Sequence, residues 1–154
     1  MHPGAALTVV NQMTIKIFPA DKAFSLCVRE RNAWCCERCG KYYPEDKRMG
    51  LHCSHYHGRG KWSTRLNGVN AWAHCFGCHR HLGSNPHEFT RWVVGRMGEQ
   101  EYELLLELSL DTKWGRQIKR DQKQVAKHYR EQHKIMLQAR QAGEIGRVEF
   151  ESWC

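Results

Sequence analysis

The chain has 154 residues, which is enough for one compact domain with an extension but not for a large multidomain machine. Hydrophobic residues make up 41% and charged residues 26%, a balance typical of a folded, water-soluble chain rather than of a disordered or membrane-spanning one. Lys and Arg outnumber Asp and Glu by 24 to 16, and the resulting formal charge of +8 favours a polyanionic partner such as nucleic acid.

The first predicted elements precede the cysteine-rich region. Residues 1–20 form an N-terminal segment, whose alternating run at 14–18 predicts a single edge strand that ends at Pro19. A helix is expected to follow, with Asp21 as its N-cap. Helical periodicity places Cys27 on the apolar face, so we interpret it as a core residue, because a buried free thiol behaves as a small hydrophobe.

Eight cysteines suit either a disulfide scaffold or metal binding. The first ten residues lack the basic region and the long apolar run of a secretory signal, and no apolar stretch approaches the roughly 20 residues of a membrane span. We therefore expect a cytoplasmic protein without a membrane anchor, in which paired cysteines hold a metal ion rather than each other.

The clearest motif is a pair of C-x-x-C knuckles separated by 35 residues, at Cys36 and Cys39 and at Cys75 and Cys78. A two-residue spacer lets a turn direct both sulfurs at one ion, and Gly40 permits the positive φ that such a knuckle often requires. Four thiolates favour zinc. The spacing therefore predicts a closed, structural zinc site that braces the fold and does no chemistry itself.

Two other interpretations of these cysteines are open at the level of sequence. Cys35 could replace Cys36, although the C-x-x-x-C spacing fits a knuckle less well. The run from Cys75 to His79 also matches the C-x-x-C-H pattern of covalent haem attachment. Haem attachment needs export, for which the sequence has no signal, and it would leave the first knuckle unexplained. We therefore expect no haem.

Between the knuckles the sequence predicts strand, irregular loop, strand and helix. Alternate side chains of a strand share a face, so the first strand should direct two sets of residues in opposite directions: Cys53, His55 and His57 on one side, and His52, Ser54 and Tyr56 on the other. A hairpin that carries histidine, Asn70 on the returning strand and His79 at the start of the following helix form the HNH, or ββα-metal, arrangement.

This arrangement favours phosphodiester hydrolysis, with a defined role for each residue. His55 is the candidate general base, because a neutral imidazole can deprotonate water at pH 7. Asn70 is expected to hold that imidazole in its working tautomer. His79, together with His52 or His57, is expected to bind one Mg²⁺ or Mn²⁺ that stabilises charge on the reacting phosphate.

Basic residues outside the histidine cluster are the candidate phosphate contacts, three of them in the loop between the strands: Arg59, Lys61 and Arg65. Helices are predicted around 88–94 and 99–110, and a long basic helix over 115–142, with further DNA contacts at Lys119, Arg120, Lys123, Lys127 and Arg130. A solvated basic face is the alternative. The weak heptad seam from Ile118 to Ala139 suits docking or a homodimer contact.

The order of these motifs resembles the NinG/Rap recombination proteins of lambdoid phages, which are themselves similar to HNH nucleases. The resemblance spans roughly Phe24 to Leu137 and is carried by both knuckles and by several short motifs: Arg29–Arg31, Ser54–Tyr56, Arg65–Asn67, Asn70, Gly83–Asn85 and Arg96–Gly98. The chain departs from the family at His79, where the family often has Asn, and at His52, where it shows Asp. The resemblance implies a structure-specific endonuclease for Holliday junctions and D-loops, made in the cytoplasm of a bacterial host.

We therefore predict a small α+β protein in three parts: an N-terminal segment at 1–20, a zinc-braced treble-clef or ββα-metal nuclease core at 21–97, and a helical basic extension at 98–154. The predicted function is that of a metal-dependent endonuclease acting on branched DNA, with structural Zn²⁺ and catalytic Mg²⁺ or Mn²⁺. The alternative is a non-catalytic treble-clef zinc module that binds DNA or a recombination partner.

Overall fold

The computed structural model describes residues 14–154; residues 1–13 of the predicted N-terminal segment, including the ten examined for a secretory signal, lie outside that range. The chain folds as a mixed α+β protein, as predicted, and it is mostly helical. Its elements, in chain order, are α1 (Pro19–Arg31), η1 (Glu45–Gly50), β1 (Leu51–His55), α2 (Trp62–Arg65), η2 (Gly68–Asn70), β2 (Ala71–Cys75), α3 (Phe76–Ser84), α4 (Pro86–Met97), α5 (Glu99–Ser109), α6 (Thr112–Arg120) and α7 (Gln122–Gln141).

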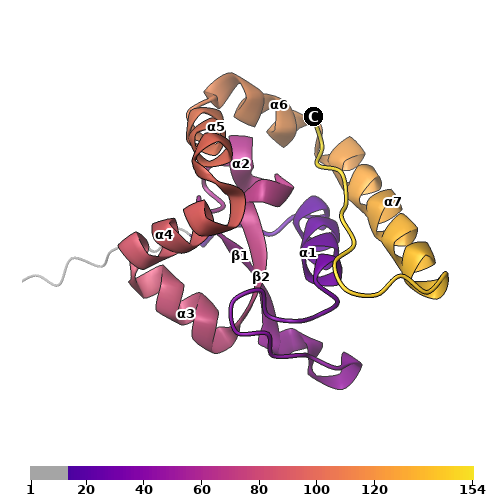
Figure 1. The fold of residues 1–154 in the computed structure, drawn as a ribbon. Coiled ribbons are helices and arrows are strands. Elements are labelled where there is room, and N and C mark those ends of the chain that lie inside the picture. The colour runs from indigo at the N-terminus through magenta and orange to yellow at the C-terminus, as the bar shows by residue number, and fades with distance from the viewer. Residues whose placement is uncertain (1–13) are drawn as a thin grey trace, which may run out of the picture.

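A two-stranded antiparallel sheet lies at the centre of the molecule (Figure 1). The register pairs Leu51 with Cys75, and His55 with Ala71. β1 is buried except at His52 and His55, which are half-buried, and β2 is buried throughout, because helices cover both faces of the hairpin. The predicted order of strand, loop, strand and helix is therefore confirmed, although the loop also contains the short helical turns α2 and η2.

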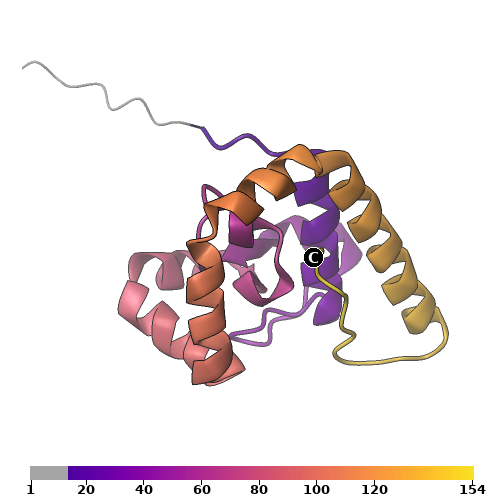
Figure 2. The same cartoon turned by 90° about the horizontal axis from the view of Figure 1, so that it is seen from above.

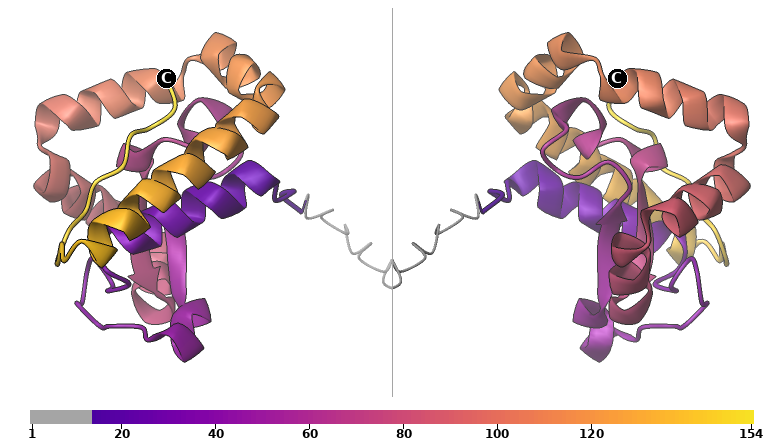
Figure 3. Two further views of the ribbon diagram at one scale, coloured as in Figure 1. Left: turned by 90° about the vertical axis from the view of Figure 1, so that its right-hand side faces the viewer. Right: turned by 90° about the vertical axis from the view of Figure 1, so that its left-hand side faces the viewer.

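One face of the hairpin packs on α1, and α7 lies along the far side of α1 (Figures 2 and 3). Phe24 and Cys27 of α1 and Tyr129 of α7 are all at most 1% exposed in this cluster. The Cys27 thiol donates a hydrogen bond to the Tyr129 carbonyl at 3.3 Å. Cys27 is therefore a core residue, as the periodicity of its helix predicts.

The opposite face of the hairpin packs on α3 and α4. Trp72 of β2 joins Leu82 of α3 and Phe89 and Val93 of α4 in a second apolar cluster. A third cluster joins both knuckles to the hairpin: Trp34, Cys36, Tyr43, Leu51, Ala73, Cys75 and Cys78. Each face of one small sheet thus meets a different set of helices, which decides where the histidines of β1 point.

The N-terminal prediction is wrong in two respects. Residues 14–18 form no strand, and the helix begins at Pro19 rather than after Asp21. Proline suits the first helical position, where its missing N–H would have no partner. Asp21 lies in the first turn instead of at the cap, and its carboxylate accepts a hydrogen bond from the Phe18 amide at 2.8 Å.

The predicted long helix over 115–142 is two helices, separated at Asp121. The Asp121 carboxylate accepts a hydrogen bond from the Gln117 side chain at 2.7 Å at this break. The apolar residues of the predicted heptad seam are buried inside the same chain: Ile118, Val125, Tyr129 and Met136. The apolar residues of the seam therefore pack chiefly on α1 of the same chain.

The C-terminal segment 143–154 is extended and returns across the molecule past α1 and the loop before β2 (Figure 2). The Val148 amide donates to the Arg31 carbonyl at 2.9 Å, and Ser152 accepts a hydrogen bond from the Gly68 amide at 2.8 Å. Residues 98–154 thus share a core with residues 21–97.

Within the described range, no helix is both long enough and apolar enough to cross a membrane.

Candidate metal centre and histidine site

The four knuckle cysteines come together as predicted. The sulfur atoms of Cys36, Cys39, Cys75 and Cys78 all lie within 4.8 Å of one another. The Sγ atoms of Cys39 and Cys75 are 3.8 Å apart. Four sulfurs at zinc–sulfur distances of about 2.3 Å in a tetrahedron would be separated by about 3.8 Å. The cluster could therefore hold a metal ion such as zinc.

Local backbone geometry explains why the knuckles form. Gly40 adopts φ +77° and donates its amide to the Cys36 carbonyl at 2.8 Å, which closes the first turn. In the second knuckle, Cys75 caps α3, and its sulfur accepts a hydrogen bond from the Cys78 amide at 3.4 Å. Cys35 lies outside the cluster. All eight cysteines lie in the described part of the chain and are free thiols, so the disulfide scaffold does not form.

Hydrogen bonds favour the thiolate form of Cys75, whereas burial raises the pKa of the Cys78 thiol to about 12. Burial raises the pKa of the Cys75 thiol, but the Cys78 amide and the neighbouring sulfurs outweigh burial and lower it to about 7. The Arg38 guanidinium donates to the Cys78 sulfur at 3.6 Å and forms an ion pair with Glu88. Thiolates are the form that binds metal, so an ion that binds at this cluster would displace the proton of Cys78.

Glu37, inside the first knuckle, connects the cysteine cluster to the free edge of β2. Its side chain is fully buried and forms an ion pair with Arg31 at 3.2 Å. A second ion pair joins it to Arg147 at 2.6 Å. Burial raises the pKa of this carboxyl, but Arg31, the Ala73 amide and Arg147 together lower it below its usual range. Sequence reasoning missed Glu37, because two of its partners, Ala73 and Arg147, are distant in the chain.

His52 of β1 and His79 of α3 form a close pair on the α3 face of the hairpin. Their Nδ1 atoms are 3.1 Å apart, and both rings are partly buried. Two imidazole nitrogens each about 2.1 Å from one cation, at about a right angle, would have this separation. Burial lowers the pKa of His79, and nearby His52 and Arg59 lower it further, so the ring is in the neutral state that a metal ligand requires.

His55 does not join this pair. It points to the opposite face of the hairpin, where its ring lies 6.0 Å from that of Phe24. Its Nε2 is 2.9 Å from the Arg65 carbonyl, which fixes the tautomer with the proton on Nε2. Burial, followed by the charge of Arg59, lowers the pKa of His55 to about 4. The candidate base is therefore neutral at pH 7, but it lies apart from the candidate cation ligands.

Asn70 holds the backbone of His57 rather than the ring of His55. Its Oδ1 accepts from the His57 amide at 2.8 Å, and its Nδ2 donates to the His57 carbonyl at 2.9 Å. A third bond runs from Nδ2 to the Thr64 carbonyl at 3.1 Å. The role expected of Asn70, fixing the tautomer of His55, belongs to the Arg65 carbonyl. Asn70 instead fixes the loop that follows β1.

Two further histidines, His57 and His74, are not part of this pair. His57 is half-buried, and burial followed by the charge of Lys61 lowers its pKa. Within residues 14–154, the four cysteines are the one group of three or more metal-binding side chains with all ligand atoms this close, so His57 does not complete a site with the pair. His74, opposite His52 in the register, is fully buried 4.8 Å from the Trp92 ring.

Most of the predicted phosphate contacts have side chains that can reach a phosphate, but one does not. Arg65 is buried, and its Nε and Nη2 each lie 2.8 Å from the Asp21 carboxylate, so it anchors the loop to α1 and is not free to bind a phosphate. Lys61 is exposed and Arg59 is half-buried. The five predicted contacts in the last two helices are all exposed: Lys119, Arg120, Lys123, Lys127 and Arg130.

Comparison of the chain with protein-family models, with curated proteins and with solved structures found no match in any of the three.

Proposed function

We propose that this chain is a metal-dependent DNA endonuclease in which β1, β2 and α3 form a ββα-metal unit braced by a structural zinc. The observation that carries the proposal is the pair of imidazole nitrogens, 3.1 Å apart, contributed by His52 and His79. A strand and a helix position the two ligands, and the helix starts at the cysteine cluster. The cation would polarise a phosphodiester and stabilise the departing oxygen.

Two imidazoles leave most of the coordination sphere of the cation open to water and to substrate phosphate. Mg²⁺ prefers oxygen ligands, whereas imidazole binds the later divalent ions of the first transition row more tightly. We therefore expect Mn²⁺ to support faster cleavage than Mg²⁺ does. An enzyme that is active with Mg²⁺ and inactive with Mn²⁺ would contradict the assignment of this pair.

The general base is assigned to His55 or His57. His55 has a fixed tautomer that leaves Nδ1 free to accept a proton, but a pKa of about 4 makes it a weak base at pH 7. His57 lies in the loop that Asn70 holds in place. Separate His55→Ala and His57→Ala variants distinguish them, because only loss of the base should lower kcat while cation affinity is retained.

The preference for branched DNA rests on the resemblance to NinG/Rap proteins. The positive charge of the exposed residues on α6 and α7 supports binding of DNA of any sequence. Lys123 and Lys127 are four residues apart in α7 and so share a helical face, and Lys119 lies near the end of α6, just before the break at Asp121. These lysines would bind a duplex arm, while the histidine pair acts on the strand next to it.

The deciding experiment incubates the purified chain with a labelled four-way junction and with a linear duplex, in Mn²⁺. Cleavage of the junction in preference to the duplex is expected. His79→Ala should abolish cutting and retain zinc. The matched control is His81→Ala in the same helix, which removes an exposed imidazole paired with Glu88 and should cut normally. Equal activity of both variants would contradict the proposal.

A non-catalytic zinc module that binds DNA is the second candidate, and the position of His55 favours it. A histidine that packs on Phe24 and pairs with the Arg65 carbonyl has a structural role without any catalysis. This candidate predicts DNA retention that weakens steeply with salt, with a logarithmic slope of about −0.9 for each phosphate contact. It also predicts no strand scission with any divalent cation.

A further inference from the structure

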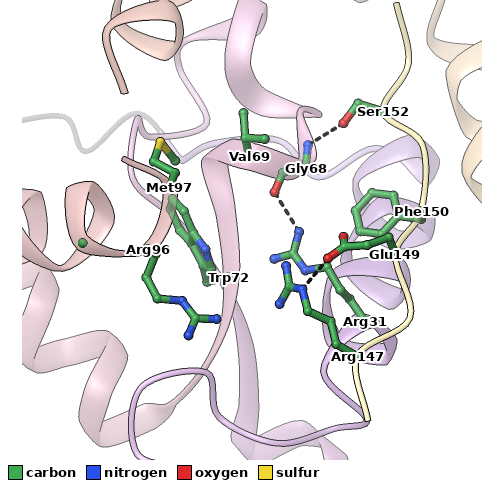
Figure 4. Close-up of a pocket in the computed structure, with 11 residues that line it drawn as sticks. Arg31, Gly68, Val69, Trp72, Arg96, Met97, Arg147, Glu149, Phe150 and Ser152 are labelled. Carbon is green, nitrogen blue, oxygen red and sulfur yellow. Dashed lines mark hydrogen bonds and ion pairs between the residues drawn. The ribbon is translucent and has the colours of Figure 1, made fainter. Parts of the chain in front are cut away.

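A cavity of about 510 Å³ lies on the side of the hairpin where the C-terminal segment passes β2 (Figure 4). Trp72 and Met97 form one wall, and Phe150 stands on the other. Three arginines from distant parts of the chain line it: Arg31, Arg96 and Arg147. Among residues 14–154, no cysteine or histidine lines this cavity, so it is separate from the candidate metal centre.

The three guanidinium groups lie around the Glu37 carboxylate, but they differ in how many of their N–H groups have a hydrogen-bond or ion-pair partner. Arg31 is 3% exposed and donates to the carbonyls of Gly68 and Ala71 and to Glu37, yet its buried Nε–H has no partner in the described part of the chain. Arg147 is held between Glu37 and Glu149.

Arg96 is the least engaged of the three. Its Nη2 lies 3.5 Å from the Glu37 carboxylate, its side chain is 42% exposed, and within residues 14–154 it makes no hydrogen bond. A guanidinium group has five N–H donors in a planar fork that matches two oxygens of a phosphate. Arg96 therefore presents unused donors at the cavity.

We propose that this cavity binds a phosphate ester of nucleotide size. The phosphate would lie on Arg96 and Arg147, and the organic part would contact Val69, Met97 and Phe150. The volume lies within the range of about 300–1,000 Å³ that is usual for small-ligand sites. Bidentate arginine contacts are charge-assisted and about twice as strong as neutral hydrogen bonds. The ligand is either a free nucleotide or one nucleotide unit of a DNA strand.

This site does not depend on the proposed nuclease activity, because it uses neither a divalent cation nor a histidine. Glu149 competes with the ligand, since its carboxylate is 64% exposed and pairs with Arg147 from the cavity wall. Removing that carboxylate should therefore tighten binding, and removing Arg96 should weaken it. The proposal therefore predicts that the two variants change ligand affinity in opposite directions.

The experiment is isothermal titration calorimetry of the zinc-loaded chain, without other divalent ions, using deoxyadenosine 5′-monophosphate, inorganic phosphate and a single-stranded DNA 12-mer as separate probes. We expect saturable binding of the mononucleotide or of the 12-mer, with inorganic phosphate weaker than the mononucleotide. Arg96→Gln should weaken binding at least about tenfold, as expected for loss of hydrogen bonds to a charged group. Glu149→Gln should strengthen it several-fold.

Arg91→Gln is the matched control, because Arg91 is an exposed arginine of the same helix that does not line the cavity. Binding of the mononucleotide that depends on Arg96 identifies a free nucleotide site, and an effect of Arg96 seen only with the 12-mer identifies a strand-binding site. The proposal is overturned if no probe binds saturably, or if Arg91→Gln weakens binding as much as Arg96→Gln. Loss of junction cleavage by His79→Ala with nucleotide binding retained would separate this site from the nuclease.

Discussion

Glu37 and Ala73 pair as neighbouring strand residues would, although Glu37 lies in a metal knuckle. The Glu37 amide donates to the Ala73 carbonyl at 2.7 Å, and the Ala73 amide donates to the Glu37 carboxylate at 2.8 Å. The free edge of β2 is thereby closed by one residue of the first knuckle. Hairpin and cysteine cluster are consequently a single structural unit.

Glu37→Gln should destabilise the fold strongly. The substitution removes the charge that neutralises the buried Arg31, and breaking a buried ion pair in this way costs about 3–5 kcal/mol. The free energy of unfolding measured in urea should fall by that amount. Glu88→Gln is the control, because Glu88 pairs with Arg38 and His81 near the surface, and it should change stability little. A similar loss of unfolding free energy in both variants would show that the burial of Glu37 does not add to its contribution to stability.

Removal of one knuckle cysteine should remove the metal. The chain purified from zinc-containing medium is expected to carry one zinc, measured by elemental mass spectrometry. Cys78→Ser should lose zinc and unfold at lower urea, because ion binding contributes directly to folding free energy. Cys154→Ser, which replaces an exposed thiol outside the cluster, should keep the full metal content. Zinc retained by Cys78→Ser would contradict the four-thiolate site.

Acid should weaken the fold through His55. Its pKa is lowered from 6.5 to about 4 in the folded state, so the unfolded chain takes up a proton first as the pH falls. The stabilisation is complete above about pH 6.5 and is lost progressively between pH 6.5 and pH 4, by up to about 3 kcal/mol. Urea unfolding at pH 7 and pH 5 measures the loss.

In His55→Gln the dependence of stability on pH should be shallower than in the wild type. His87→Gln is the control, because His87 is exposed, and it should retain the wild-type slope. An imidazole of His55 that titrates near pH 6.5 in nuclear magnetic resonance would refute this account of its burial.

Loss of the hydroxyl oxygen of Tyr129 should lower the stability of the fold. Its buried hydroxyl donates to the Leu66 carbonyl and accepts from the Trp153 amide at 2.9 Å, so it joins α7, the inter-strand loop and the C-terminal segment. Tyr129→Phe leaves both partners unpaired and should cost about 1–3 kcal/mol of unfolding free energy. Tyr42→Phe, at a 60% exposed side chain, should have no effect on the urea midpoint.

The sequence predicts those parts of the site that depend on local spacing. Both C-x-x-C pairs converge because each knuckle is a short turn whose geometry depends on its own residues. The alternation along β1 also predicts that His52 and His55 lie on opposite faces, and they do. Grouping His55 with His79 gave more weight to the HNH pattern than to this alternation, and the structure does not bring those two side chains together.

Contacts between residues that are far apart in the sequence could not be predicted in the same way. Nothing near Arg65 in the sequence indicates that it pairs with Asp21, since 44 residues separate them. The cavity at Arg96 likewise depends on Arg147, which reaches β2 only because α7 packs on α1 and the chain then turns back. Charge pattern alone identifies a basic residue, but packing decides whether its side chain is exposed or buried.

The packing of α7 on α1 has one further consequence. The apolar stripe that a coiled-coil dimer would bury is already covered within one molecule, so folding of this helix is a unimolecular event. The melting temperature should therefore be independent of protein concentration over a hundredfold dilution, because mass action affects only folds that need a second chain.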